Sequence, residues 1–215
     1  MAKAKIMGSS TVITRNGKDG SIDIQRSHLW SPVDRTSGEA APVDHGFVGW
    51  TFDPALAFGT SQPSAGVVSL ARVNLGPRMT LSVSTLWASL SAGGQGLSNC
   101  FLGVYTVSGT NATLAGASSD LSSRFGAAGE VSATLGSPAT IAGGQPAWIL
   151  VALLVGGAST MPIFRGALAQ SLVNVNLTGL AKRYATVGSG LTSLPQSFTS
   201  TDVGALGSLP WVAAG

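Results

Sequence analysis

Short apolar runs separated by glycine, proline, serine and asparagine dominate the sequence from about residue 54 onward. None of these runs continues into a helical period with capping residues at its ends. A parallel sheet would need crossover helices, so the pattern predicts an all-β fold, a jelly-roll-like antiparallel β-sandwich. The predicted strands cover residues 67–75, 80–90, 100–107, 112–117, 131–135, 148–155 and 183–187.

Two of the predicted strands distribute their apolar residues differently. In residues 80–90, Leu81, Val83, Thr85 and Trp87 alternate with mostly polar neighbours, a pattern typical of a strand with one core face. Residues 148–155 are apolar at every position, which predicts a central strand covered on both sides. A neighbouring subunit is one candidate for the second cover.

The first 53 residues differ in charge from the remainder. They hold six basic and six acidic residues of the chain's 12 and 9, which leaves six and three for the other 162 residues. Apolar residues are sparse in this segment, so it cannot form a core of its own. Residues 10–14 and 21–25 predict a small hairpin, because the Asn-Gly and Asp-Gly pairs between them favour a turn. We therefore expect an N-terminal attachment arm over residues 1–53, hairpin plus extended segment, and a β-sandwich over residues 54–215.

Composition limits the kind of partner the chain is expected to have. Hydrophobic residues make up 44% and charged residues 10%, where a soluble domain typically has about a quarter charged. We therefore expect partner chains to cover much of the surface. The net charge of +3 is too small to indicate nucleic-acid binding.

Membrane insertion and secretion are not expected. The longest apolar run, residues 148–155, is far shorter than the roughly 20 residues of a spanning helix. The first residues lack the apolar region of a secretory signal. The sequence thus predicts synthesis in a cytoplasm followed by entry into an assembly.

Residues able to carry catalysis are few. Asp120, Glu130 and Asp202 are the acidic residues after position 53, and each is predicted to be a solvated loop carboxylate rather than half of a glycosidase pair. His28 and His45 are too few for a convincing relay, and Asp44-His45 alone makes a weak metal site. Cys100 is predicted to be a buried small hydrophobe. We expect no enzymatic activity, no cofactor and no metal.

Aromatic residues are the remaining candidates for a binding role. Trp87 and Trp148 fall in predicted strands and are expected in the core. Trp30, Trp50 and Trp211 flank irregular segments, and together with Tyr184 they are the candidate ligand or interface contacts.

Residues 65–211 resemble a domain found at the ends of minor tail and other virion proteins of tailed bacteriophages, notably those of actinobacteria. Four segments carry the resemblance: TLW at 85–87, FLGVYTVSGTNATLA at 101–115, QPAWILVA at 145–152 and LTSLPQSFT at 191–199. The resemblance implies a β-sandwich in a virion, without known catalytic residues in this domain and commonly trimeric. Longer family members have more chain before the domain than the fifty or so residues found here.

The leading hypothesis is a structural component of a tailed-phage virion, a minor tail or fibre-type protein that forms homo-oligomers, with a trimer favoured. Its N-terminal arm would attach to other virion proteins. One alternative is a capsid decoration or head-fibre protein. Another is a module that binds glycans on the host surface through aromatic side chains.

Overall fold

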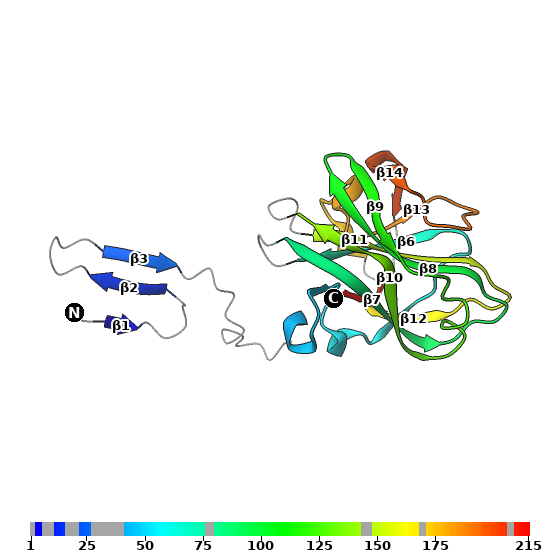
Figure 1. The fold of residues 1–215 in the computed structure, drawn as a ribbon, viewed down its shortest axis with the longest axis horizontal. Helices are drawn as coiled ribbons and strands as arrows, with labels where there is room; N and C mark the ends of the chain where they lie inside the picture. The colour runs from blue at the N-terminus through cyan, green and yellow to red at the C-terminus, as the bar shows by residue number, and fades with distance from the viewer. Residues whose placement is uncertain are drawn as a thin grey trace. The chain divides into compact units, whose positions relative to one another are not determined.

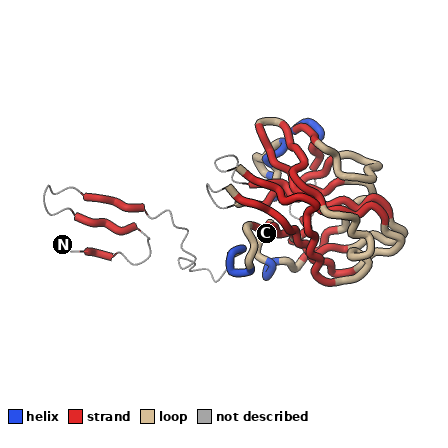
Figure 2. Tube along the Cα trace, in the orientation of Figure 1, coloured by secondary structure: helices blue, strands red, loops and turns tan. Residues whose placement is uncertain are grey.

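The computed structural model describes residues 3–5, 11–15, 22–26, 41–75, 80–142, 148–167, 171–205 and 209–215. The chain divides into two compact units, Met1–Ala41 and Pro42–Gly215, called the N-terminal unit and the sandwich unit below. The described regular structure is almost entirely antiparallel β-strand, as Figures 1 and 2 show. The all-β prediction is therefore confirmed. Trp30 and His28 lie outside the described residues.

The N-terminal unit contains one three-stranded antiparallel sheet. Its strands, β1 (Lys3–Lys5), β2 (Thr11–Arg15) and β3 (Ile22–Arg26), lie in the order β1-β2-β3. The predicted hairpin is β2 with β3, and its register runs from Thr11↔Arg26 to Arg15↔Ile22. Strand β1 was not predicted, because three residues are too few to show an alternation.

The sandwich unit contains two seven-stranded sheets. The strand order in the first sheet is β16-β12-β7-β17-β4. Two further strands join this sheet, β10 by pairing with β7 and β5 by pairing with β12. The strand order in the second sheet is β14-β9-β8-β11-β6-β13-β15. The bounds of the first sheet are β4 (Gly49–Trp50), β5 (Gly59–Ser61), β7 (Leu81–Ala92), β10 (Gly129–Ile141), β12 (Ile163–Ala167), β16 (Leu209–Pro210) and β17 (Val212–Ala214). Those of the second are β6 (Val68–Asn74), β8 (Ser98–Ser108), β9 (Asn111–Ala117), β11 (Trp148–Gly157), β13 (Tyr184–Val187), β14 (Ser197–Thr199) and β15 (Val203–Ala205).

Helical structure in the described residues is confined to five short 3-10 turns: η1 (Pro42–His45), η2 (Pro54–Leu56), η3 (Ser171–Asn174), η4 (Gly179–Ala181) and η5 (Ser200–Asp202). No helix in these parts of the chain is long and apolar enough to cross a membrane. The strand orders support a sandwich-like antiparallel fold, and the jelly-roll connectivity stays a prediction.

The main core lies between the two sheets. Leu86 and Leu90 of β7 and Val131 of β10 meet Leu102 of β8 and Leu153 of β11 in one buried cluster. Cys100 belongs to this cluster and is fully buried, which confirms its predicted role as a small hydrophobe. Burial raises the pKa of its thiol, although a hydrogen bond with Ser122 opposes the shift.

The predicted core face of β7 is correct only in its first half. Val83 is fully buried, but from Leu86 onward the buried residues are the even-numbered ones, and Trp87 lies on the other face. The register with β10 shifts at the same place, between the pairs Ala139↔Val83 and Thr134↔Thr85. A bulge of this kind reverses the faces of a strand, so Trp87 is only partly buried and contacts Phe47 at 4.8 Å between ring centroids.

Strand β11 is central and covered on both faces, as predicted. It lies between β8 and β6, and residues 149–155 are all buried. The cover on its outer face comes from the chain itself, however, and not from a neighbouring subunit. Leu150 and Leu154 pack in a second cluster with Leu180, Leu194 and Phe198, all of which lie C-terminal to β11. Residues 180–203 therefore cover this face of β11. An uncovered apolar strand is thus no longer a reason to expect oligomerisation.

The sandwich unit begins at Pro42, twelve residues before the boundary expected from charge. Val48 N donates to Ala214 O at 2.8 Å, Thr51 N donates to Val212 O at 3.0 Å, and β4 pairs with β17. The segment after Pro42 therefore fills the edge of the first sheet. Its partners lie more than 160 positions later in the sequence, as the Thr51–Val212 separation of 161 shows, so no local pattern reveals the pairing.

Candidate functional site

The three aromatic candidates that the structure describes, Trp50, Trp211 and Tyr184, do not form one site. Trp211 is only 6% exposed, and its indole N–H donates to the carbonyl oxygen of Phe52 at 3.0 Å. Trp50 is partly buried, with its ring centroid 6.3 Å from that of Phe47 and 5.5 Å from that of His45. Both tryptophans belong to an aromatic cluster that holds the segment after Pro42 against β7 and β17.

Tyr184 lies in the second sheet, apart from that cluster, and is 1% exposed. Its ring belongs to the core between the sheets, with the guanidinium carbon of Arg183 5.7 Å from the ring centroid. Burial raises the pKa of Tyr184 to about 12, although Arg183 and Arg72 pull it downward. The hydroxyl is thus a neutral phenol at ordinary pH, and it has no hydrogen-bond partner among the described residues.

Two buried tyrosines offer a matched test of how their hydroxyls are used. Tyr105→Phe should lower the free energy of unfolding by about 1–2 kcal/mol, because Tyr105 Oη donates to Pro195 O at 2.6 Å and that carbonyl would lose its partner. Tyr184→Phe should cost less than about 0.5 kcal/mol, since no such bond is lost. Urea denaturation followed by fluorescence measures both. Equal losses in the two variants would contradict this assignment.

The three candidate carboxylates lie at separate places in the fold. Asp120 and Asp202 accept hydrogen bonds within their own turns, whereas Glu130 makes no such bond in the described residues. Asp120 Oδ1 accepts hydrogen bonds from Cys100 N at 3.0 Å, Ser122 N at 2.9 Å and Ser122 Oγ at 2.6 Å. Asp202 caps η5, where its Oδ2 accepts from Thr199 N at 2.7 Å. Glu130 is exposed at the start of β10. Asp120 and Asp202 thus stabilise the backbone of the turns in which they lie, which is a structural role typical of loop carboxylates.

The pKa values of the two turn carboxylates follow from these bonds. Partial burial alone would raise the pKa of Asp120, but the hydrogen bonds from Ser122 and from the backbone of Cys100, Ser122 and Asn99 bring it below its ordinary value. The hydrogen bonds from Thr199 lower the pKa of Asp202 in the same way. Both groups are ionised at neutral pH.

Replacing Asp120 should reveal its structural role. Asp120→Ala should lower the free energy of unfolding by about 1–2 kcal/mol at pH 7, because three accepted hydrogen bonds are lost. A depressed folded-state pKa stabilises the native state above the ordinary pKa of 3.8, and this stabilisation disappears as pH falls through the lower folded value. The difference between wild type and variant should therefore shrink below about pH 4. Denaturant titrations at several pH values measure it, with Glu130→Ala as the control; a difference that stays constant with pH would refute the assignment.

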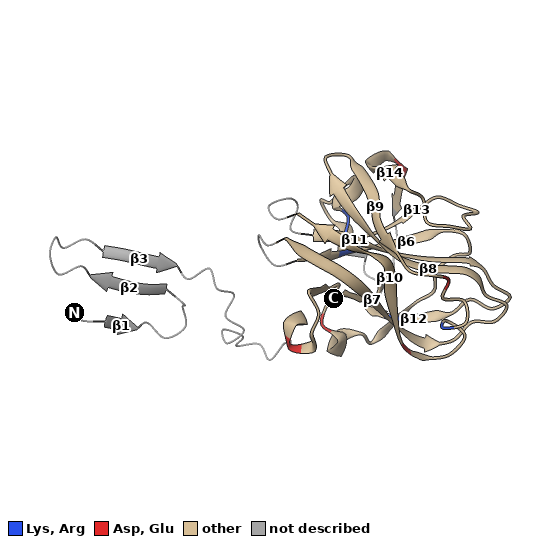
Figure 3. Ribbon diagram, viewed as in Figure 1, with Lys and Arg blue, Asp and Glu red and all other residues tan. Residues whose placement is uncertain are grey.

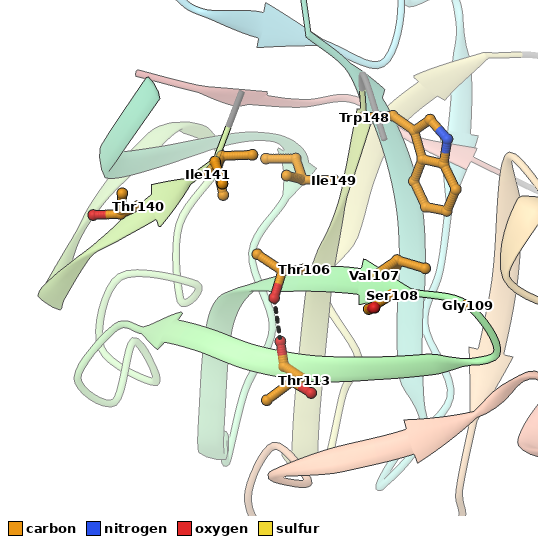
Figure 4. A pocket seen from close by; sticks show the side chains of 10 residues that line it. Thr106, Val107, Ser108, Gly109, Thr113, Thr140, Ile141, Trp148 and Ile149 are labelled. Carbon is orange, nitrogen blue, oxygen red and sulfur yellow. Dashed lines mark hydrogen bonds between the residues drawn. The ribbon is translucent and has the colours of Figure 1, made fainter. Parts of the chain in front are cut away.

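A pocket of about 470 Å³, called the hairpin pocket, lies beside the β8–β9 hairpin (Figure 4). It is bordered by the end of β8 and the start of β9 on one side and by the end of β10 and the start of β11 on the other. Its lining residues are Thr106, Val107, Ser108, Gly109, Thr113, Thr140, Ile141, Ala142, Trp148 and Ile149.

Of the predicted contact residues, the three that the structure describes, Trp50, Trp211 and Tyr184, do not line the hairpin pocket. Trp148, predicted to be a core residue, borders it, but Figure 4 shows its indole and the side chain of Ile149 on opposite sides of β11. The indole packs instead against the second cluster, with the guanidinium carbon of Arg72 5.6 Å from its ring centroid. The sequence signal for this pocket is the pair of hydroxyl residues at alternate positions 106 and 108, a pattern that is also common on exposed strand faces.

The described residues hold no group of three or more His, Cys, Asp or Glu side chains that could bind one metal ion. A scan against protein-family models found no match to the chain, and a search of the curated proteins found no relative.

Proposed function

We propose that the chain is a structural component of a tailed-phage virion, a minor tail or fibre-type protein that attaches through its N-terminal unit. The observation that carries the proposal is the division into two units of unequal size. Strands of three, five and five residues make an N-terminal sheet that is too small to be stable without packing on something else. A partner protein of the particle is the proposed support.

Homo-oligomerisation, with a trimer favoured, is part of the proposal. Because the outer face of β11 is covered by the chain itself, that face does not support oligomerisation. The proposed oligomer therefore rests on the composition of the chain and on its resemblance to phage virion proteins. Figure 3 shows how thinly charged residues are spread over the described part of the sandwich unit. A surface this poor in charge favours burial against other chains in an assembly.

Purified particles provide the test. The full chain should be found in virions by mass spectrometry, and a full-length Ile13→Asp/Ile24→Asp variant should be lost from them, because these residues pair across β2 and β3. Ser197→Asp, at an exposed position of β14 in the sandwich unit and opposite Thr113, is the control for adding charge elsewhere. Absence of the wild-type chain from virions would overturn the proposal, and normal incorporation of the double variant would overturn attachment through this unit.

Copy number then separates the two locations. A few to tens of copies per particle support the tail, and hundreds support capsid decoration. Native mass spectrometry of the full chain should give three copies per assembly, and a monomer at all concentrations would overturn the oligomer.

No catalytic step is part of the proposal. The support is that Asp120 and Asp202 are engaged in their own turns by short hydrogen bonds. Polysaccharide hydrolysis by the purified chain that disappears in Asp120→Ala or Glu130→Ala would overturn it.

A further inference from the structure

Two arginine side chains, called the arginine pair below, lie close together in the second sheet. Arg72 is in β6 and Arg183 directly precedes β13, and Arg72 N donates to Arg183 O at 2.8 Å. Burial lowers the pKa of Arg72, and the nearby positive charge of Arg183 lowers it further, while Tyr184 opposes the shift. Guanidinium groups stay protonated at ordinary pH, so the fold holds two like charges near each other.

No carboxylate neutralises the arginine pair. Neither guanidinium forms an ion pair with an acidic side chain in the part of the chain that the structure describes. Asp202, the acidic residue that follows Arg183 in the sequence, accepts from Thr199 instead. Lys182 adds a third positive charge next to Arg183. Uncompensated like charges repel, so an anion that lies against both guanidiniums would stabilise this part of the sheet.

The fold positions the arginine pair before any ligand binds. Arg72 Nη1 donates to Ala181 O at 2.8 Å, and its guanidinium carbon lies 5.6 Å from the centroid of the Trp148 ring. Asn174 Oδ1 accepts from Arg183 N at 2.9 Å, which fixes the backbone that carries Arg183. Side chains that are already held in place lose little conformational entropy when a ligand binds.

Several N–H groups of the arginine pair are left over for a ligand. Arg72 Nε is enclosed and has no partner, so a ligand cannot reach it, but Arg72 Nη2 forms no hydrogen bond in the described residues and is open to solvent. The guanidinium of Arg183 likewise forms no hydrogen bond there, and none of its nitrogens is enclosed. Its carbon lies 5.7 Å from the centroid of the Tyr184 ring. Both arginine side chains are only partly buried, so their free N–H groups are accessible.

The chemistry of the arginine pair selects an oxyanion. A guanidinium presents its N–H groups in a flat fork that matches two oxygens of a carboxylate or a phosphate. Two guanidiniums carry two positive charges, which one carboxylate does not balance. A phosphate monoester carries about 1.5–2 negative charges at pH 7 and therefore does. A neutral ligand would leave the repulsion between the arginines in place.

We propose that the arginine pair binds one phosphate group, with Arg72 Nη2 and the guanidinium fork of Arg183 donating to its oxygens. The group is either free inorganic phosphate or the terminal phosphate of a monoester. The inference goes beyond the proposed virion role and does not depend on it.

Calorimetry of the full chain with inorganic phosphate and with glycerol 1-phosphate is the test. At least one of the two should bind, and the stronger of them shows whether the ligand is the free ion or a phosphorylated molecule. Arg183→Gln should weaken binding by about tenfold or more, since charge-assisted hydrogen bonds are lost. Arg124→Gln, at an exposed position outside the pair, is the matched control and should leave binding unchanged. Phosphate should also raise the Tm of the wild type more than that of Arg183→Gln.

Three results would overturn the proposal. They are no binding of either compound at millimolar concentration, equal affinity of wild type and Arg183→Gln, and an equal rise in Tm in sodium chloride of the same ionic strength, which would show charge screening alone. Circular dichroism confirms that each variant is folded. If Arg183→Gln does not fold, Arg183→Lys replaces it: this variant keeps the charge but lacks the fork, so it should still bind phosphate more weakly than the wild type.

Discussion

Phe198→Ala should lower the free energy of unfolding of the sandwich unit by about 3–5 kcal/mol, which corresponds to a fall in Tm on the order of 10 °C. Phe198, in β14, is only 6% exposed and lies in the cluster that covers the outer face of the second sheet. Its ring centroid is 4.8 Å from that of Tyr105, at an interplanar angle of 59°. Truncation would leave a cavity against Tyr105 and Leu154, which neighbouring strands hold in place. Urea and thermal unfolding measure the loss.

The dependence of that loss on protein concentration tests whether the outer face of the second sheet is covered by the same chain or by a neighbouring subunit. Because Phe198 belongs to the same chain as β11, the loss should be the same at low and high concentration. Phe58→Ala is the control: Phe58 is 79% exposed, so its truncation should cost less than about 0.5 kcal/mol. A loss that shrinks as concentration rises would show that a neighbouring subunit contributes to the cover, contrary to the packing of Phe198 against Leu150 and Leu154 of the same chain.

Strands with strong apolar patterns could be predicted from sequence because the pattern reports burial directly. The run from Trp148 to Val155 has no polar position, and it forms a strand in which residues 149–155 are all buried, so both of its faces are covered. Strand β10 was predicted only over residues 131–135, although it extends to Ile141. Its second half was not predicted, because Gly136 and Pro138 are typical of turns rather than strands. The register shift between β10 and β7 accommodates both residues.

Elements defined by distant pairing could not be predicted. β4 and β17 are two and three residues long, and they exist because they pair with each other and because β17 also pairs with β7. The cover of Leu150 and Leu154 depends on Leu180, Leu194 and Phe198, which lie in segments without strong periodicity. Such contacts arise from the tertiary arrangement, so local propensity leaves no trace of them.

In the candidate site, too, local sequence pattern predicted some features, whereas those that depend on distant contacts could not be predicted. Trp211 and Tyr184 were singled out as possible contacts because large aromatic residues dominate interfaces, but both are buried within the sandwich unit. The hairpin pocket depends on Thr113 and Ile141 meeting near β8, and they are 28 positions apart on different sheets. Sequence identified the β8–β9 hairpin, whereas the space beside it depends on where β10 ends.

Gly93, directly after β7, lies against backbone that cannot easily move away. A Cβ built on Gly93 would be 2.2 Å from Gly126 O and 2.5 Å from Ala127 N. Neighbouring Phe125 anchors this loop: it is fully buried, and its ring centroid is 5.2 Å from that of Phe164. Gly94 N also donates to Phe125 O at 2.9 Å, which fixes the separation between the two segments.

Gly93→Ala should therefore destabilise the sandwich unit by about 1–3 kcal/mol, because one methyl group forces β7 and the Phe125 loop apart. Thermal unfolding should show a fall of several degrees, about 2–4 °C for each kcal/mol. Gly136→Ala is the matched control: a Cβ there would meet Ala117 O at 3.6 Å, an ordinary contact, and the backbone has no positive φ. Since alanine also restricts the unfolded chain, Gly136→Ala should be neutral or stabilising by up to about 1 kcal/mol. If Gly93→Ala were as stable as Gly136→Ala, the close approach of Gly126 to β7 would be wrong, and with it the placement of Phe125 in the core.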